Sequence, residues 1–182
     1  MQSSLVRNNK KVAQSIWGKL SPISAHALED LATRFRFSVA SGDLLLLYGS
    51  WYITHSALLR LASRRHCSSI NASPLRHFCD SAANRWAFRA TVYKSRSCRG
   101  FVGYGDADPS NVSPLVRGAE MRVAETRAVN RALRKAYGIG ICSIEEIGGL
   151  DGAQSSRAAE RSHRSLRMEI TAAPKSAIAS AS

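Results

Sequence analysis

The clearest pattern of side chains along the chain lies in residues 85–93. Trp86, Phe88, Ala90 and Val92 alternate there with Ala87, Arg89, Thr91 and Tyr93. Successive side chains of a strand point to opposite faces, so this two-residue period predicts a β-strand with one buried face. Residues 95–97 (Ser-Arg-Ser) fit a turn, and residues 99–105 are predicted to return as a second strand.

Shorter patterns precede this hairpin. Residues 51–53 fit a short strand, and Thr54 is a good N-cap for a helix that runs to residue 65. Residues 70–78 fit a weaker strand that Pro74 interrupts. Because proline cannot donate a ladder hydrogen bond, we expect this strand at an edge or with a bulge.

A long helix is predicted after the hairpin. Ser113 fits its N-cap, Pro114 fits the first helical position and Gly138 fits the residue that ends it, about six turns later. The resulting order is β-α-β-β-β-α. The sequence therefore predicts an α+β fold in which an antiparallel sheet packs on one long helix.

The sequence divides into three parts. Residues 1–41 read as an N-terminal extension, where residues 12–20 and 25–35 fit short helices and loose packing or disorder is the alternative. Residues 42–150 read as an α+β domain, for which the excess of Lys and Arg over Asp and Glu favours nucleic-acid binding. Residues 151–182 are rich in Ser, Ala and Arg and hold few large apolar side chains, which predicts a disordered basic tail.

The net charge of the chain restricts the class of binding partner. The 26 Lys and Arg outnumber the 13 Asp and Glu, which gives a net charge of +13 and favours a polyanion. Nucleic acid is the expected polyanion, and an anionic membrane surface is the alternative. The scattered cysteines and the lack of a signal peptide or a long apolar run favour a protein that is soluble, not secreted, and cytoplasmic (nucleoid-associated) or nuclear.

The cations fall into two groups. On a helical projection of the long helix, Arg127, Arg131, Arg134 and Lys135 gather opposite an apolar arc, into which Arg122, Glu125 and Asn130 intrude. Such a stripe would match a phosphate backbone, although a solvated helix face is the alternative. The second group interleaves with aromatic residues around the hairpin and comprises Arg89, Lys94, Arg96 and Arg99, with Tyr104 close by. Cations beside aromatic faces are typical of sites for unstacked bases, whereas Trp86 and Phe88 are interpreted as sheet core.

Catalytic signatures are weak. The Gly-rich segment 103–111 lacks the glycines of a dinucleotide loop and the spacing of a calcium loop, and the His and Cys residues lack a zinc-site spacing. We therefore expect no catalytic residue, no metal and no cofactor. Two alternatives stay open. One is a small metal-dependent nuclease or nucleotide-acting hydrolase that uses Asp106, Asp108 and Glu125, and the other is an RNA-binding module.

Four segments together resemble a known family. They are residues 51–55 (Trp-Tyr-Ile-Thr-His) with Leu58, Leu61 and Ala62; residues 101–105 (Phe-Val-Gly-Tyr-Gly); residues 125–134 (Glu-Thr-Arg-Ala-Val-Asn-Arg-Ala-Leu-Arg) followed by Gly138; and residues 140–142 (Gly-Ile-Cys). In order and spacing they are similar to the single-strand annealing proteins of the Rad-fifty-two superfamily. The resemblance covers residues 48–147.

The resemblance implies a function. Proteins of that family bind single-stranded DNA in a basic groove, assemble into homo-oligomeric rings and anneal complementary strands without ATP. Arg131 and Arg134 match two groove residues, whereas Asn130 stands where the family has Lys and Ser56 where it has Arg, for which Arg60 would substitute. No counterpart of the recombinase-binding tail is recognisable. The predicted DNA contacts are Arg60, Arg89, Lys94, Arg96, Arg99, Tyr104, Arg127, Arg131, Arg134 and Lys135.

Overall fold

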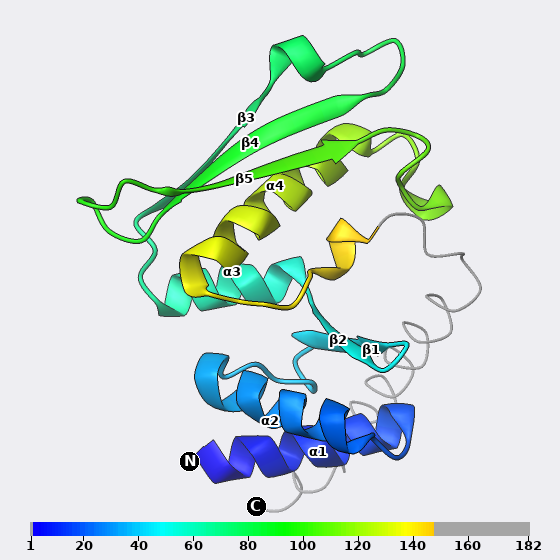
Figure 1. Ribbon diagram of the computed structural model, residues 1–182, viewed down its shortest axis with the longest axis vertical. Coiled ribbons are helices and arrows are strands. Elements are labelled where there is room, and N and C mark those ends of the chain that lie inside the picture. The colour runs from blue at the N-terminus through cyan, green and yellow to red at the C-terminus, as the bar shows by residue number, and fades with distance from the viewer. Residues whose placement is uncertain (1, 148–182) are drawn as a thin grey trace, which may run out of the picture. The chain divides into compact units, whose positions relative to one another are not determined.

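Residues 2–147 are the part of the chain that the computed structural model describes (Figure 1). The helices are α1 (Gln2–Trp17), α2 (Pro22–Phe35), α3 (His55–Arg64) and α4 (Glu120–Tyr137), and the strands are β1 (Leu44–Leu47), β2 (Ser50–Ile53), β3 (Ser69–Pro74), β4 (Trp86–Tyr93) and β5 (Phe101–Ala107). Three short 3-10 turns complete this part: η1 (Arg76–Phe78), η2 (Pro114–Val116) and η3 (Ile144–Glu146). The predicted α+β class is confirmed, including the antiparallel sheet on a long helix.

The larger sheet is antiparallel and has the order β3-β4-β5. Its register places Phe88 opposite Gly105 and Ala90 opposite Gly103, and these residues are buried against α4. The expected strand at residues 85–93 is confirmed as β4. The strand expected at residues 70–78 is shorter than predicted, because β3 ends at Pro74 on the sheet edge and a 3-10 turn follows.

The long helix begins later than predicted. Ser113 does act as an N-cap, but it caps η2, and α4 starts only at Glu120 after Gly118 with φ +85°. Leu115 is therefore exposed outside the helix. The C-terminal end agrees with the sequence, since Gly138 ends α4 in the left-handed conformation with φ 66°.

The N-terminal segment is folded. α1 and α2 pair with each other, and the buried Asn9 side chain donates to Phe37 O (2.8 Å) and accepts from Val39 N (3.0 Å). Trp51 of β2 donates its indole N–H to Ser24 O of α2 at 2.7 Å. β2 pairs with β1 in a separate two-stranded hairpin rather than in the larger sheet.

The described residues 2–147 belong to one compact unit. The basic tail expected over residues 151–182 lies outside the described residues. No helix of the described part is long and apolar enough to cross a membrane.

Candidate nucleic-acid interface

The basic side chains of α4 reach the free edge of β5. Lys135 Nζ donates to Val102 O (2.8 Å), Arg131 Nη1 to Tyr104 O (2.8 Å) and Arg127 Nη1 to Asp106 O (2.7 Å). Four helical residues rise about 6 Å, and two strand residues span about 6.6 Å. Because these repeats match, the cation at every fourth residue of the helix meets the outward carbonyl at every second residue of the edge strand.

Arg127 does not belong to an exposed stripe, so the prediction of its position is wrong. Its side chain is buried, with 4% of the residue exposed, and it also donates to Glu145 O (2.8 Å) and to Asn111 Oδ1 and O (2.9 and 2.8 Å). Burial lowers the pKa of the Arg127 guanidinium, and nearby Asp106 opposes that shift. Arg127 thus joins α4 to β5, to the loop before η2 and to η3.

Arg131 and Arg134 share one carboxylate. Glu146, whose side chain is 7% exposed, lies 3.2 Å from Arg131 Nε and accepts from Arg134 Nη1 at 2.7 Å on both oxygens. Burial alone would raise the pKa of Glu146, but hydrogen bonds from Arg134 and from the Ser143 N–H and hydroxyl outweigh it and lower the pKa. The open cationic row expected from the sequence is therefore largely occupied by contacts within the chain.

The helix is also rotated relative to the expected projection. Arg122 and Glu125, expected within the apolar arc, are exposed. Asn130 is buried there as expected, and it contacts His55 Nδ1 (2.5 Å), Ser143 Oγ (2.9 Å) and Glu145 (3.1 Å). The projection failed because it included Leu115 and Ala119, which lie before the helix.

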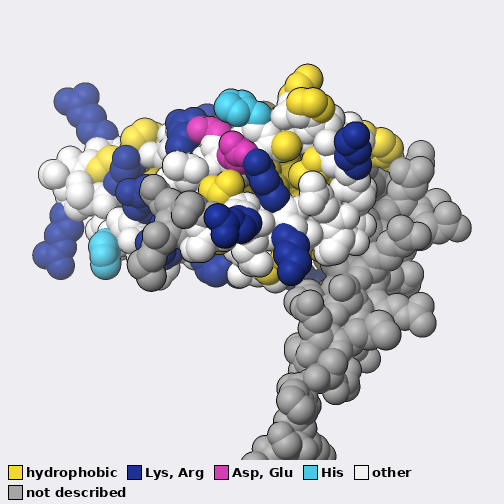
Figure 2. Space-filling model, turned by 90° about the horizontal axis from the view of Figure 1, so that it is seen from below, with side chains coloured by type: hydrophobic (Ala, Val, Ile, Leu, Met, Phe, Trp, Pro, Cys, Tyr) yellow, Lys and Arg dark blue, Asp and Glu magenta, His cyan; other side chains and the backbone are white. Residues whose placement is uncertain are grey.

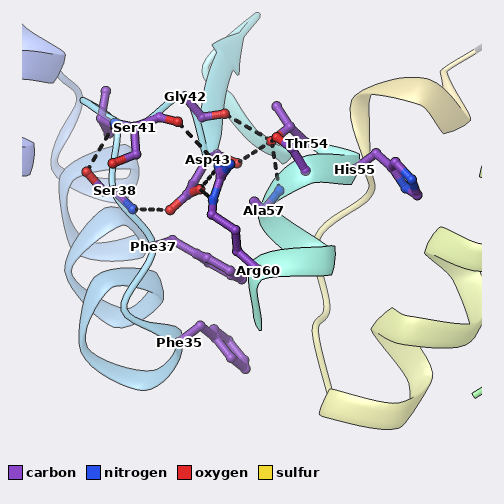
Figure 3. A network of polar contacts seen from close by, with 12 residues as sticks. Phe35, Phe37, Ser38, Ser41, Gly42, Asp43, Thr54, His55, Ala57 and Arg60 are labelled. Carbon is purple, nitrogen blue, oxygen red and sulfur yellow. Dashed lines mark hydrogen bonds and ion pairs between the residues drawn. The ribbon is translucent and has the colours of Figure 1, made fainter. Parts of the chain in front are cut away.

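Arg60 holds a buried acid rather than facing an open groove. Asp43 accepts from Arg60 Nε at 3.0 Å and Nη2, and from Ser38 N at 2.7 Å (Figure 3). The Arg60 side chain still keeps 42% of its surface exposed. Its position on α3 is therefore fixed by the loop that follows α2.

The sheet face opposite α4 carries two further predicted residues, Arg89 and Tyr104. We call this the outer face; it comprises Asn71, Ser73, Ala87, Arg89, Thr91, Val102, Tyr104 and Asp106. Arg89 lies directly opposite Tyr104 on the neighbouring strand, and both side chains are exposed. The register thus places a cation beside an aromatic ring, a pairing that the linear sequence does not show.

The hairpin after β4 extends the cationic surface. Lys94, Arg96 and Arg99 are exposed there, and Lys94 Nζ lies 5.8 Å from the ring centre of Phe101. Within the described part of the chain, Arg89, Arg96 and Arg99 have no hydrogen-bond or ion-pair partner for their side chains. Their donors are therefore available to phosphate oxygens.

A hollow of about 630 Å³ lies at the end of the sheet where β4 begins and β5 ends. Its aromatic lining comprises Phe78, Trp86, Phe88 and Tyr104, and its charged lining includes Arg85, Asp106 and Asp108. Sequence reasoning assigned Phe78 no role. The interpretation of Trp86 as sheet core is confirmed, since this half-buried residue packs against the hydrophobic core. The sequence signal that could have indicated Phe78 is its position, because an aromatic residue follows shortly after the strand that ends at Pro74.

The acids of the nuclease alternative are not gathered into a metal site. Across residues 2–147, no group of three or more His, Cys, Asp or Glu side chains is placed to hold a metal ion. Asp108 accepts from the Ser110 hydroxyl and N–H, and these hydrogen bonds lower the pKa of its carboxyl. These contacts fit the interpretation of segment 103–111 as a tight connection.

Positive charge is not confined to the sheet. Arg7, Lys11 and Lys19 are exposed on and just after α1. The face on which α1 lies shows Lys and Arg side chains spread among few acids (Figure 2). These residues lie far from the hairpin in the chain and offer a matched control for tests of the outer face.

Comparison of the chain with protein-family models, with curated proteins and with solved structures found no match.

Proposed function

We propose that this protein binds single-stranded DNA on the outer face of its three-stranded sheet and anneals complementary strands without ATP. The observation that carries the proposal is the exposed Arg89–Tyr104 pair, continued by Arg96 and Arg99 on the hairpin, with no acid pairing these three arginines in the described part of the chain. Cations would hold phosphates while the aromatic ring stacks on a base.

The proposed surface is long enough for several phosphates. Arg89 and the end of β4 are four residues apart, which corresponds to about 13 Å along the strand. The hairpin cations lie beyond that end. Unstacked bases can contact Tyr104, because its ring projects from the same face as Arg89.

In this proposal the basic side chains of α4 stabilise the sheet rather than make the first contacts with DNA. Arg127, Arg131 and Lys135 hold the carbonyls of β5, and Glu146 holds Arg131 and Arg134. They fix the strand from which Tyr104 projects. We therefore place the first phosphate contacts on Arg89, Lys94, Arg96 and Arg99 rather than on α4.

Binding is tested by fluorescence anisotropy with a labelled oligo-dT over a salt series. Each phosphate contact on a single strand contributes about 0.7 to the slope of log affinity against log salt. The triple variant R89A/R96A/R99A should bind more weakly, with a slope that is smaller by about 2. Competition with an RNA oligonucleotide of equal length separates the RNA-binding alternative.

The matched control is R7A/K11A/K19A, which removes the same charge from exposed positions around α1. It should leave the affinity nearly unchanged. Equal losses in both triple variants would mean that general charge, and not the outer face, binds DNA. Absence of oligo-dT binding by the unaltered chain at low salt would overturn the proposal.

Annealing and self-assembly are supported by the family resemblance of residues 48–147. Mixing two complementary labelled oligonucleotides with the protein, without ATP, should give duplex faster than the protein-free reaction. Particle mass measured on the same sample should correspond to a ring of many copies. A monomer mass together with an unchanged annealing rate would restrict the function to binding.

A further inference from the structure

We infer that the hollow between η1 and the outer face is a pocket for one unstacked nucleobase; this inference rests on the proposed function and gives it a specific base-binding site. Two exposed aromatic residues from different elements line the hollow. Phe78 belongs to η1 and Tyr104 to β5. The volume of about 630 Å³ lies in the range of small-molecule sites.

The turn that forms one wall is held in place by many contacts. Leu75 N donates to Ala87 O (2.8 Å), and Asp80 and Arg85 exchange two backbone hydrogen bonds of 2.7 and 2.9 Å. Cys79 Sγ accepts from Ala87 N at 3.5 Å. The turn after β3 is thereby fixed to the start of β4, and it forms one wall of the hollow.

Exposure of the rings indicates an aromatic or apolar occupant. Phe78 is 66% exposed and Tyr104 is 53% exposed. Large apolar side chains that are exposed together around one hollow are typical of a binding site. A nucleobase fits because each base has two π-faces that stack on aromatic rings irrespective of sequence.

The charges of the lining favour a base over a phosphate inside the hollow. Among the lining residues the carboxylates of Asp106 and Asp108 outnumber the Arg85 guanidinium, and Asp106 also lies 3.6 Å from Arg131 Nη1 of α4. A phosphate would be repelled there, whereas ring N–H and amino groups can donate to the carboxylates. The backbone of the strand would instead follow Arg89, which lies across from Tyr104 on the outer face.

The test compares a short deoxyoligonucleotide with an abasic strand of equal length and charge. The unaltered chain should bind the base-bearing strand more tightly, by about 5- to 100-fold for one stacked base. The F78A/Y104A variant should lose this preference and keep the salt slope of the unaltered chain. Both side chains are largely exposed, so the thermal unfolding midpoint should change little.

The matched control is I23A/L115A, which removes two other exposed apolar side chains, 82% and 77% exposed, and should keep the preference.

The outcomes separate the two proposals. Equal binding of both strands by the unaltered chain, or a preference that survives in F78A/Y104A, overturns the base pocket while the proposed function stands. Failure to bind either strand overturns the proposed function and the pocket with it.

Discussion

Glu146 pairs with two arginines that the sequence pattern alone would leave as free cations. Sequence spacing places Arg131 and Arg134 on one helix face, where they read as an open cationic row. The carboxylate that occupies them comes from η3, beyond the C-terminal end of the helix. Asp106 lies 3.6 Å from Arg131 Nη1, so together with Glu146 it balances the two arginines where the sequence suggests free positive charge.

The Glu146 cluster should stabilise the fold in a pH-dependent manner. Its folded carboxyl pKa is lowered from 4.5, so its stabilisation is present above that value and disappears as the pH falls through the lower folded pKa. At pH 7, E146Q should unfold with a free energy reduced by about 1–3 kcal/mol. Urea unfolding at pH 7 and near pH 3 measures the difference, which should shrink at acid pH.

E125Q is the matched control, because Glu125 is exposed and without a side-chain partner among residues 2–147. It should change the free energy of unfolding little at either pH. A loss in E146Q that is equally large at both pH values would contradict the assigned role of the carboxylate.

At the scale of elements, the packing of α4 on β5 depends on small residues on both partners. A Cβ added at Gly103 would overlap the backbone of Ala128 and Ala132, and one at Gly105 would overlap that of Ala124 and Ala128. This close approach lets the helix cations reach the carbonyls of the edge strand. Covering the edge in this way also hinders pairing with a foreign strand.

G105A should therefore separate the helix from the strand. The added methyl group would meet backbone atoms, and overpacking of this kind reduces the free energy of unfolding by about 1–3 kcal/mol. Hydrogen exchange of β5 amides should accelerate at the same time. G140A is the control, since nothing lies within 4 Å of a Cβ there, and it should leave both measurements nearly unchanged.

At the scale of the whole described part, the N-terminal helices belong to the same compact unit as the sheet. The loop after α2 ends in Asp43, which is buried and held by Arg60 of α3 (Figure 3). Thr54 caps α3 and its N–H donates to Asp43 O at 3.0 Å. One acid thus connects the helical segment before residue 42 with the domain that follows.

D43A should loosen this connection. It leaves the Ser38 N–H and the Arg60 guanidinium without their carboxylate, which should reduce the free energy of unfolding by about 1–3 kcal/mol. Hydrogen exchange should accelerate in α2 and at the start of α3. D30A removes an exposed i,i+4 pair with Arg34 and should cost less than about 1 kcal/mol. Equal effects of the two substitutions would contradict the central role of Asp43.

The sequence by itself determined the elements and the fold class. Alternation in residues 85–93, Thr54 as an N-cap, Pro74 at the edge and Gly138 at the helix end are local signals, because they depend on the conformation of a few neighbouring residues. Local signals failed at Ser113, where a 3-10 turn and Gly118 precede the helix.

Only the tertiary structure decided which cations are free and which rings come together. Arg127 and Arg134 are occupied by atoms from segments 12 to 21 residues away, and Arg89 meets Tyr104 only through the register of two strands. Phe78 lines the same hollow as Tyr104 only because the turn after β3 is bonded to the start of β4. The physical reason is that a side chain's partners are set by long-range packing, whereas strand and helix signals are set by short-range backbone preference.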